Sequence, residues 1–167
     1  MVIYVMSMVS MFMKSKFNSN ISGWNVSRVR DFEYMFCESK FNKDISDWNL
    51  ISAIDMYYMF FGSRFNKDIS QWNTENVKNM DYLFAYSKFN GDISEWDVSK
   101  VQDMDCIFAN SLFCGNISNW NFNKSLILDS DIKRVLEIAQ RIERKKEADK
   151  LKAKLCVGNK TTLIKSL

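Results

Sequence analysis

The chain has 167 residues, 47% of them hydrophobic and 14% aromatic, and its formal net charge is +3. This composition supplies enough apolar material for one domain with a buried core, and too much for a disordered chain. The chain contains no histidine, which excludes a Ser-His-Asp or Cys-His catalytic pair, a His-ligated zinc and an imidazole proton shuttle. We therefore expect no catalytic residues and a protein that is not an enzyme.

The first thirteen residues carry no charge. A secretory signal peptide also needs a basic flank and a small-residue cleavage site, and neither is present. Met8 and Phe12 stand at the places that Met80 and Phe84 occupy in a later repeat, so we interpret the segment as a truncated repeat. Cys37 is the first cysteine, too far along the chain for a lipoprotein anchor. No apolar run reaches the roughly 20 residues of a transmembrane helix, so we expect no membrane span.

A period of 24 residues runs through most of the chain. All five tryptophans recur at this interval, and columns of phenylalanine, isoleucine and serine recur in phase with them. A unit this small cannot bury its own large side chains, so neighbouring units must stack and share one core. We expect the centre of that core to consist of Phe41, Ile45, Trp48, Phe65, Ile69, Trp72, Phe89, Ile93 and Trp96.

Each unit shows two apolar patterns. Residues 90–96 have sparse apolar positions and predict a brief strand, whereas Met104, Ile107 and Phe108 stand at i, i+3 and i+4, as on one face of a short helix. An Asp or Asn before this trio in four units predicts a helix N-cap: these residues are Asp31, Asp55, Asn79 and Asp103. We therefore predict an α/β repeat solenoid over residues 1–125, a right-handed stack of about five units made of short parallel strands and short helices.

The repeated motif carries a resemblance to a known family. Residues 41–49 read Phe-Asn-Lys-Asp-Ile-Ser-Asp-Trp-Asn, and residues 65–73 and 89–97 nearly repeat them. This motif resembles the BspA-like leucine-rich repeats of BspA family surface proteins, certain bacterial lipoproteins and proteins of large DNA viruses. The resemblance covers about residues 5–122 and implies a leucine-rich-repeat solenoid that binds other macromolecules, at a cell or virion surface, without catalytic residues.

Charged residues also form columns in the repeat. Stacked carboxylates repel one another, so we expect neighbouring lysines to supply counter-charge, with a column of bound metal as the alternative. A column of basic residues could bind an extended acidic partner or could be an ordinary solvated face. The candidate binding residues are Lys40, Lys43, Asp44, Arg64, Lys67, Asp68, Lys88 and Asp92. The four cysteines lack zinc-ligand spacing, and we expect neither a metal site nor a cofactor.

Residues 126–167 differ from the repeats, with 11 Lys and Arg against 6 Asp and Glu. Asp129 or Ser130 can cap a helix there, and Gly158 can end it. A helical stripe follows the cap: Leu128, Ile132, Val135, Ala139 and Ile142. We expect this helix to cap the last unit, with a dedicated partner-binding helix as the alternative, and it could also mediate self-association. A charge of +3 is weak for a nucleic-acid-binding protein, so nucleic acid is not an expected partner.

Two functions remain open at this point. The first is a non-enzymatic module whose repeated polar side chains bind a protein or a glycan, as in adhesion at a cell surface. The second is a structural component of a virion or other assembly, in which the repeats act as a spacer and the C-terminal helix docks a neighbour.

Overall fold

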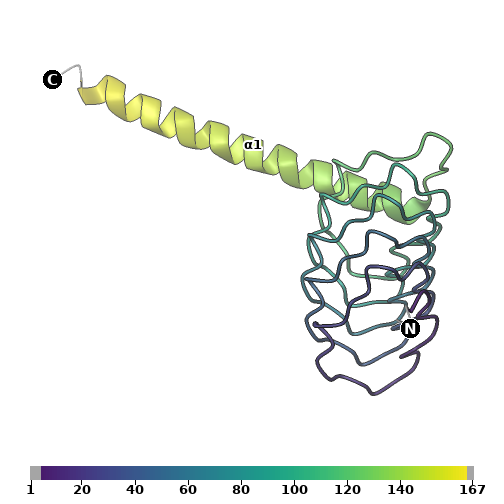
Figure 1. The fold of residues 1–167 in the computed structure, drawn as a ribbon. Coiled ribbons are helices and arrows are strands. Elements are labelled where there is room, and N and C mark those ends of the chain that lie inside the picture. Colours follow the sequence, from purple (N-terminus) through teal and green to yellow (C-terminus); the bar gives the residue numbers. More distant parts are fainter. Residues whose placement is uncertain (1–4, 165–167) are drawn as a thin grey trace.

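The computed structural model describes residues 5–164, with side chains as far as Leu151. The repeats wind as coils of 24 residues that lie on top of one another (Figure 1). One helix, α1 (Ser130–Ile164), begins on the last coil and projects away from the stack. Within the described part of the chain, no helix is long and apolar enough to cross a membrane.

The predicted α/β repeat solenoid is wrong, and the leucine-rich-repeat architecture implied by the resemblance is wrong with it. Among residues 5–164, α1 is the only helix, and the coils contain neither the short helices nor the short strands that we expected. The only pairings of strand type in that range are isolated parallel bridges, and they link one residue in each coil to its equivalent in the next. These residues are Ser7, Asp31, Asp55, Asn79 and Asp103.

Turns replace the predicted short helices because alternate backbone N–H groups bond to the next coil. The N–H groups of Phe32, Tyr34 and Phe36 donate to carbonyls 23 residues further on, each at 2.9 Å. Between them, the N–H groups of Met35 and Cys37 close turns onto carbonyls three residues back, at 3.1 and 3.0 Å. A helix would use all of these groups internally. The i, i+3, i+4 pattern therefore identified buried positions without identifying the hydrogen-bond partners of the backbone.

Two residues in each coil adopt a left-handed backbone conformation, with φ between 52° and 61°. They stand four positions apart, and only one of them is glycine. This conformation costs an L-residue about 1–2 kcal/mol and is incompatible with a continuous right-handed helix. The residues are Ser10, Lys14, Tyr34, Glu38, Tyr58, Gly62, Tyr82, Tyr86, Cys106 and Asn110.

Three of the four predicted helix N-caps stabilise turns instead. The side-chain oxygen Oδ1 of Asp31, Asp55 and Asn79 accepts a hydrogen bond from the backbone N–H two residues later, at 2.8–3.0 Å. This is the Asx-turn geometry that Asp and Asn favour outside helices. A capping residue and an Asx-turn residue have the same side chain, which explains why the sequence did not separate them.

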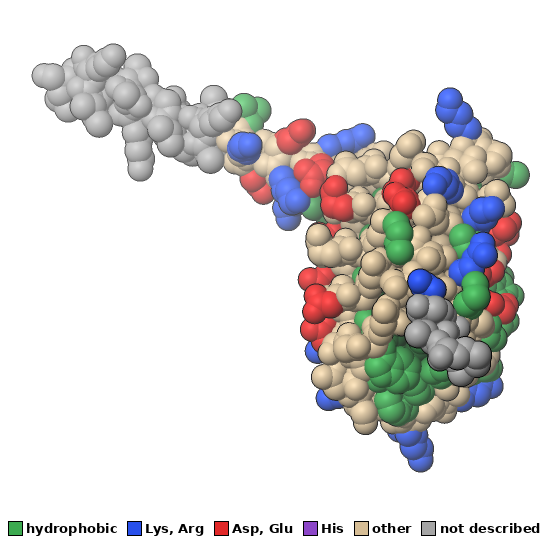
Figure 2. Space-filling model, viewed as in Figure 1, with side chains coloured by type: hydrophobic (Ala, Val, Ile, Leu, Met, Phe, Trp, Pro, Cys, Tyr) green, Lys and Arg blue, Asp and Glu red, His purple; other side chains and the backbone are tan. Residues whose placement is uncertain are grey.

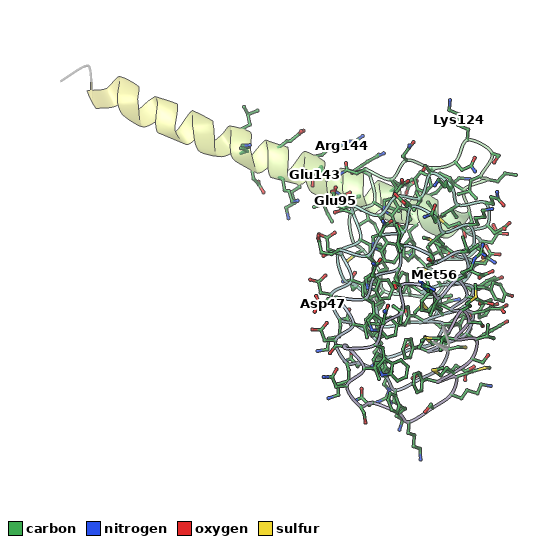
Figure 3. The ribbon with its side chains drawn as sticks, viewed as in Figure 1. Asp47, Met56, Glu95, Lys124, Glu143 and Arg144 are labelled. Carbon is green, nitrogen blue, oxygen red and sulfur yellow. The ribbon has the colours of Figure 1, made fainter. Side chains whose placement is uncertain are left out.

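The core is continuous from coil to coil. Equivalent rings stack on one another: the centroids of Phe41 and Phe65 lie 6.2 Å apart, and those of Phe65 and Phe89 lie 6.3 Å apart. Met56 lies inside the coils, fully buried (Figure 3). The side chains of the Phe, Ile and Trp columns are at most 3% exposed: Phe41, Ile45, Trp48, Phe65, Ile69, Trp72, Phe89, Ile93 and Trp96.

The tryptophan column also joins the coils through hydrogen bonds. The indole N–H of each of four tryptophans donates to the isoleucine carbonyl of the preceding coil, at 2.8–3.2 Å. Tryptophan combines a large apolar ring with an N–H donor, so it can be buried in the core and still bond to a backbone carbonyl. The four residues are Trp48, Trp72, Trp96 and Trp120.

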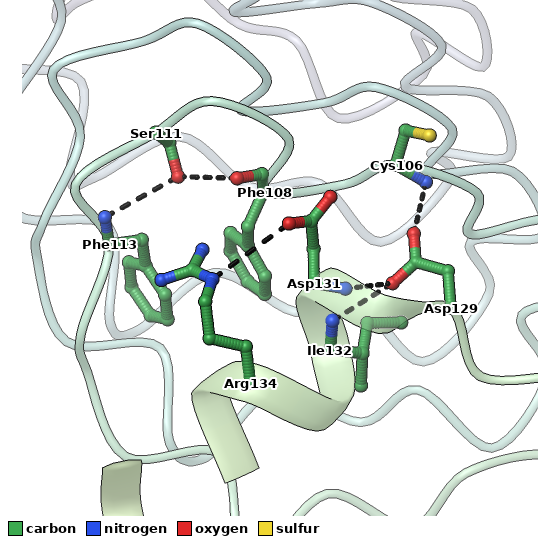
Figure 4. Close-up of polar contacts among 8 residues, drawn as sticks. All are labelled: Cys106, Phe108, Ser111, Phe113, Asp129, Asp131, Ile132 and Arg134. Atoms are coloured by element: carbon green, nitrogen blue, oxygen red, sulfur yellow. Dashed lines mark hydrogen bonds and ion pairs between the residues drawn. The ribbon is translucent and has the colours of Figure 1, made fainter. Parts of the chain in front are cut away.

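Asp129 connects the last coil to α1 (Figure 4). As predicted, it caps the helix: its Oδ1 accepts from the N–H groups of Asp131 and Ile132, both at 2.9 Å. Its Oδ2 accepts a hydrogen bond from the backbone N–H of Cys106. Cys106 is the equivalent of Tyr82 one coil later, and the N–H of Tyr82 donates to a carbonyl of the next coil. One carboxylate thus starts the helix and satisfies a donor at the end of the stack.

The first turns of α1 pack on the last coil. Ile132, Val135 and Ala139 are at most 2% exposed, and Ile142 is 41% exposed. The helix then continues past Gly158 to Ile164, so the predicted end at that glycine is wrong. A single glycine costs a helix only about 1 kcal/mol relative to alanine, which is too little to end it.

Candidate binding surface

The candidate binding residues occupy the same stretch of three successive coils, and all eight are exposed. Their register is fixed by the backbone: the N–H groups of Lys40, Arg64 and Lys88 donate to serine carbonyls of the preceding coil, at 3.0–3.3 Å. The backbone of each coil is therefore held while the charged side chains face solvent.

A polar groove brings four of these residues together. It has a volume of about 460 Å³ and lies between two adjacent coils. Its lining consists of Asn42, Lys43, Asp44, Ser46, Lys67 and Asp68. A second groove, of about 390 Å³, includes Asp92 and is otherwise lined by Asn90, Gly91, Ser94, Gly115, Asn116 and Asn119. Lys40, Arg64 and Lys88 line neither of these two grooves.

The carboxylates of the two grooves are held by turns. Asp44, Asp68 and Asp92 each accept a hydrogen bond at Oδ1 from the backbone N–H of the serine two residues later, at 2.9–3.0 Å. This N–H, followed by the hydroxyl of the same serine, holds the pKa of Asp44 and Asp68 below the usual value. Lys67 contributes a smaller lowering of the pKa of Asp44. The expected counter-charge is thus present but secondary, and both carboxylates are charged at neutral pH.

An asparagine column continues along the same surface. The backbone N–H groups of Asn42, Asn66 and Asn90 each donate to the side-chain oxygen of the equivalent asparagine one coil earlier, at 2.9–3.0 Å. Cys114 ends the column: its backbone N–H still donates to Asn90, at 2.9 Å, but its thiol carries no amide oxygen for a further coil. This ladder fixes the spacing of the polar side chains on either side of it.

Sequence reasoning missed a second serine column, which supports the groove from inside. The hydroxyl oxygens of these serines accept from the backbone N–H of the phenylalanine two residues later, at 3.0–3.4 Å. Their recurrence two positions before each phenylalanine was visible in the sequence and marks this turn. The residues are Ser39, Ser63, Ser87 and Ser111, all buried.

A third groove was not anticipated from the sequence. Its volume is about 440 Å³ and its lining is largely apolar, with arginines among the lining residues. It is formed by Met6, Arg28, Arg30, Ile51, Ser52, Ile54 and Asn76. Within the described side chains, no group of three or more Cys, Asp and Glu is placed to hold a metal ion.

Comparison with known proteins gives one family. The chain matches the family described as "Mycoplasma protein of unknown function, DUF285" over residues 2–64 and 55–146. No curated protein gives a significant match, and no solved structure does either. The two matched segments overlap, and together they cover the coils and the first part of α1. The chain belongs to the DUF285 family.

Proposed function

We propose that this protein is a non-enzymatic binding module that holds a protein or glycan on the polar surface of its coils. The observation that carries the proposal is the groove in which Lys43, Asp44, Lys67 and Asp68 come together. Two ammonium groups supply donors and two carboxylates supply acceptors, which is the combination that hydroxyl-rich and peptide ligands require.

The repetition of the groove supports an extended ligand. One coil later the asparagine, aspartate and serine return as Asn90, Asp92 and Ser94, whereas Gly91 stands in the place of the lysines; the asparagine column fixes the backbone register. Because these Asn, Asp and Ser groups recur, a ligand with repeating units can contact both grooves at once, and the contacts reinforce one another. The resemblance of the motif to BspA-like repeats of surface proteins points in the same direction.

Charge reversal in the groove tests the proposal. The full chain is screened on arrays of glycans and of peptides, and the strongest hit is titrated against Lys43→Glu/Lys67→Glu and against a control, Lys78→Glu/Lys124→Glu. Both control lysines are exposed and lie outside the groove, and Lys124 points into solvent near the last coil (Figure 3). We expect the groove variant to bind at least about tenfold more weakly with unchanged thermal unfolding, and the control to bind normally. Equal binding by both variants, or no hit on either array, would contradict the proposal.

A further inference from the structure

We propose that the protein self-associates, with the projecting part of α1 of one copy lying on an acidic and aromatic surface of a second copy. This inference is independent of the groove described above, because it concerns a different stretch of each coil and the helix that leaves the stack.

The described side chains of the projecting part of α1 are open to solvent. Every side chain of residues 140–151 is exposed, including Leu151 at 60%. The helix runs away from the coils (Figure 1), and basic (blue) side chains lie among acidic (red) ones where it emerges (Figure 2). Residues 140–164 contain eight Lys and Arg against three Asp and Glu. At 1.5 Å per residue, this segment is about 37 Å long, and most helical stability in proteins comes from packing against a partner.

The complementary surface lies on the turns of the coils, and we name it the Tyr–Asp face. Its rings touch from coil to coil: the centroids of Tyr34 and Tyr58 lie 5.1 Å apart, and those of Tyr58 and Tyr82 lie 4.6 Å apart. Tyr86 is 56% exposed. The face consists of Tyr34, Tyr57, Tyr58, Tyr82 and Tyr86 with the carboxylates of Asp31, Glu33, Asp55, Asp81, Asp103 and Asp105.

The carboxylates of the Tyr–Asp face crowd one another. Burial raises the pKa of Glu33, and the neighbouring Asp31 and Asp55 raise it further. Burial is also the largest cause of the raised pKa of Asp55 and Asp81. The ion pairs Lys14–Glu38, Arg134–Asp131 and Lys146–Glu143 use none of the carboxylates of this face. A cationic partner would therefore relieve repulsion on the face as well as gain contacts of its own.

The rise of one helical turn is close to the spacing of the coils. Successive coils are joined by parallel bridges, for which the spacing is about 4.8 Å, and one turn of an α-helix rises about 5.4 Å. A helix lying along the stack thus presents one turn to each coil. Its Lys and Arg side chains can place their aliphatic stems and charged ends against tyrosine rings, with carboxylates within reach.

A second copy is the partner that the charges select. The helix carries the positive charge, the Tyr–Asp face of the coils carries the negative charge, and α1 leads away from the coils of its own molecule (Figure 1). Each copy has one helix and one face, so a reciprocal exchange closes a twofold dimer. Such a dimer would give the C-terminal helix the docking role that the sequence suggested.

Complementary charge reversal provides the test. The face variant is Asp103→Lys/Asp105→Lys, and the helix variant is Arg141→Glu/Lys145→Glu; all four residues are exposed. The control, Asp47→Lys/Glu95→Lys, makes the same charge change as the face variant at two exposed residues on another side of the coils (Figure 3). The masses of the full-length proteins are measured by sedimentation equilibrium at low and high salt.

We expect the native chain and the control to form dimers that weaken with salt, and each of the other variants alone to dissociate at least about tenfold more readily. An equimolar mixture of face and helix variants should restore the dimer, because both contacts of the mixed pair are then between opposite charges. If the face variant fails to fold, Tyr86→Ser replaces it as the loss-of-dimer variant. The proposal would be overturned by a native chain that is monomeric, by a dimer that neither variant weakens, or by a mixture that stays monomeric. It would also be overturned if α1 of the native chain bound only nucleic acid or lipid vesicles.

Discussion

Replacement of Asp129 tests the junction between the last coil and α1. In Asp129→Ala the helix loses its N-cap, which costs about 1 kcal/mol, and the half-buried N–H of Cys106 loses its acceptor, which costs about 1–3 kcal/mol. We therefore expect the free energy of unfolding to fall by about 2–4 kcal/mol. Asp129→Asn separates the two contributions. Asparagine caps a helix as well as aspartate, so this variant keeps the cap, but its amide nitrogen cannot accept the hydrogen bond from Cys106.

Urea unfolding followed by circular dichroism and tryptophan fluorescence provides the measurement. Trp120 lies in the last coil and packs against Phe108, with ring centroids 6.1 Å apart, so it reports on the covered end of the stack. Asp131→Asn serves as the control, because Asp131 makes a partly exposed ion pair with Arg134 at 3.8 Å, and its loss should cost less than about 1 kcal/mol. The reasoning is refuted if Asp129→Ala is as stable as the control, or if Asp129→Asn is as unstable as Asp129→Ala.

Three further predictions follow from the coils. Gly62→Ala should lose about 1–2 kcal/mol in thermal unfolding, because φ is 61° there and the new Cβ would lie 3.2 Å from Cγ of Glu38; equal stability would contradict this. Trp72→Phe should cost about 2–3 kcal/mol in urea, since its indole N–H bonds to a carbonyl of the preceding coil at 3.0 Å, whereas the partly exposed Trp24→Phe should cost less than about 1 kcal/mol; similar losses in both would show that the bond is unimportant. The pKa of Asp81 is raised above 3.8, chiefly by burial, so its carboxyl binds a proton more readily in the folded chain and its stability contribution is lost as pH rises through the folded pKa. Asp81→Asn should therefore gain stability relative to the native chain on going from pH 3 to pH 7, and a constant difference in urea titrations would refute that.

The 24-residue period predicted which side chains meet, because identical residues at a fixed interval can share a core only if successive units are in register. The stacked rings of Phe36, Phe60 and Phe84 show this register directly, with centroids 5.5 and 5.8 Å apart. The same period placed Lys43 and Lys67 in one groove. The stacked rings and the groove depend on the identity and spacing of side chains, and both can be read from the sequence.

The path of the backbone could not be predicted in the same way. Tyr34 and Tyr82 adopt a left-handed conformation that sequence reasoning assigns to glycine, and hydrogen bonds to the neighbouring coil stabilise it there. Such bonds depend on the whole stack, so a window of one repeat cannot show them. The role of Asp44 as a turn-stabilising residue was missed for a different reason. An Asp two residues before a Ser marks an Asx turn, but Asp44 was interpreted only as part of a column of charges.

The asparagine and tryptophan contacts link each coil to its neighbours through equivalent atoms. Excision of a whole period, such as residues 65–88, would therefore rejoin like with like and preserve the contacts across the cut. Removal of 23 or 25 residues would shift every later column out of alignment. The length of such a chain can accordingly change in evolution by whole coils, while its two ends, which lack this interchangeability, stay as they are.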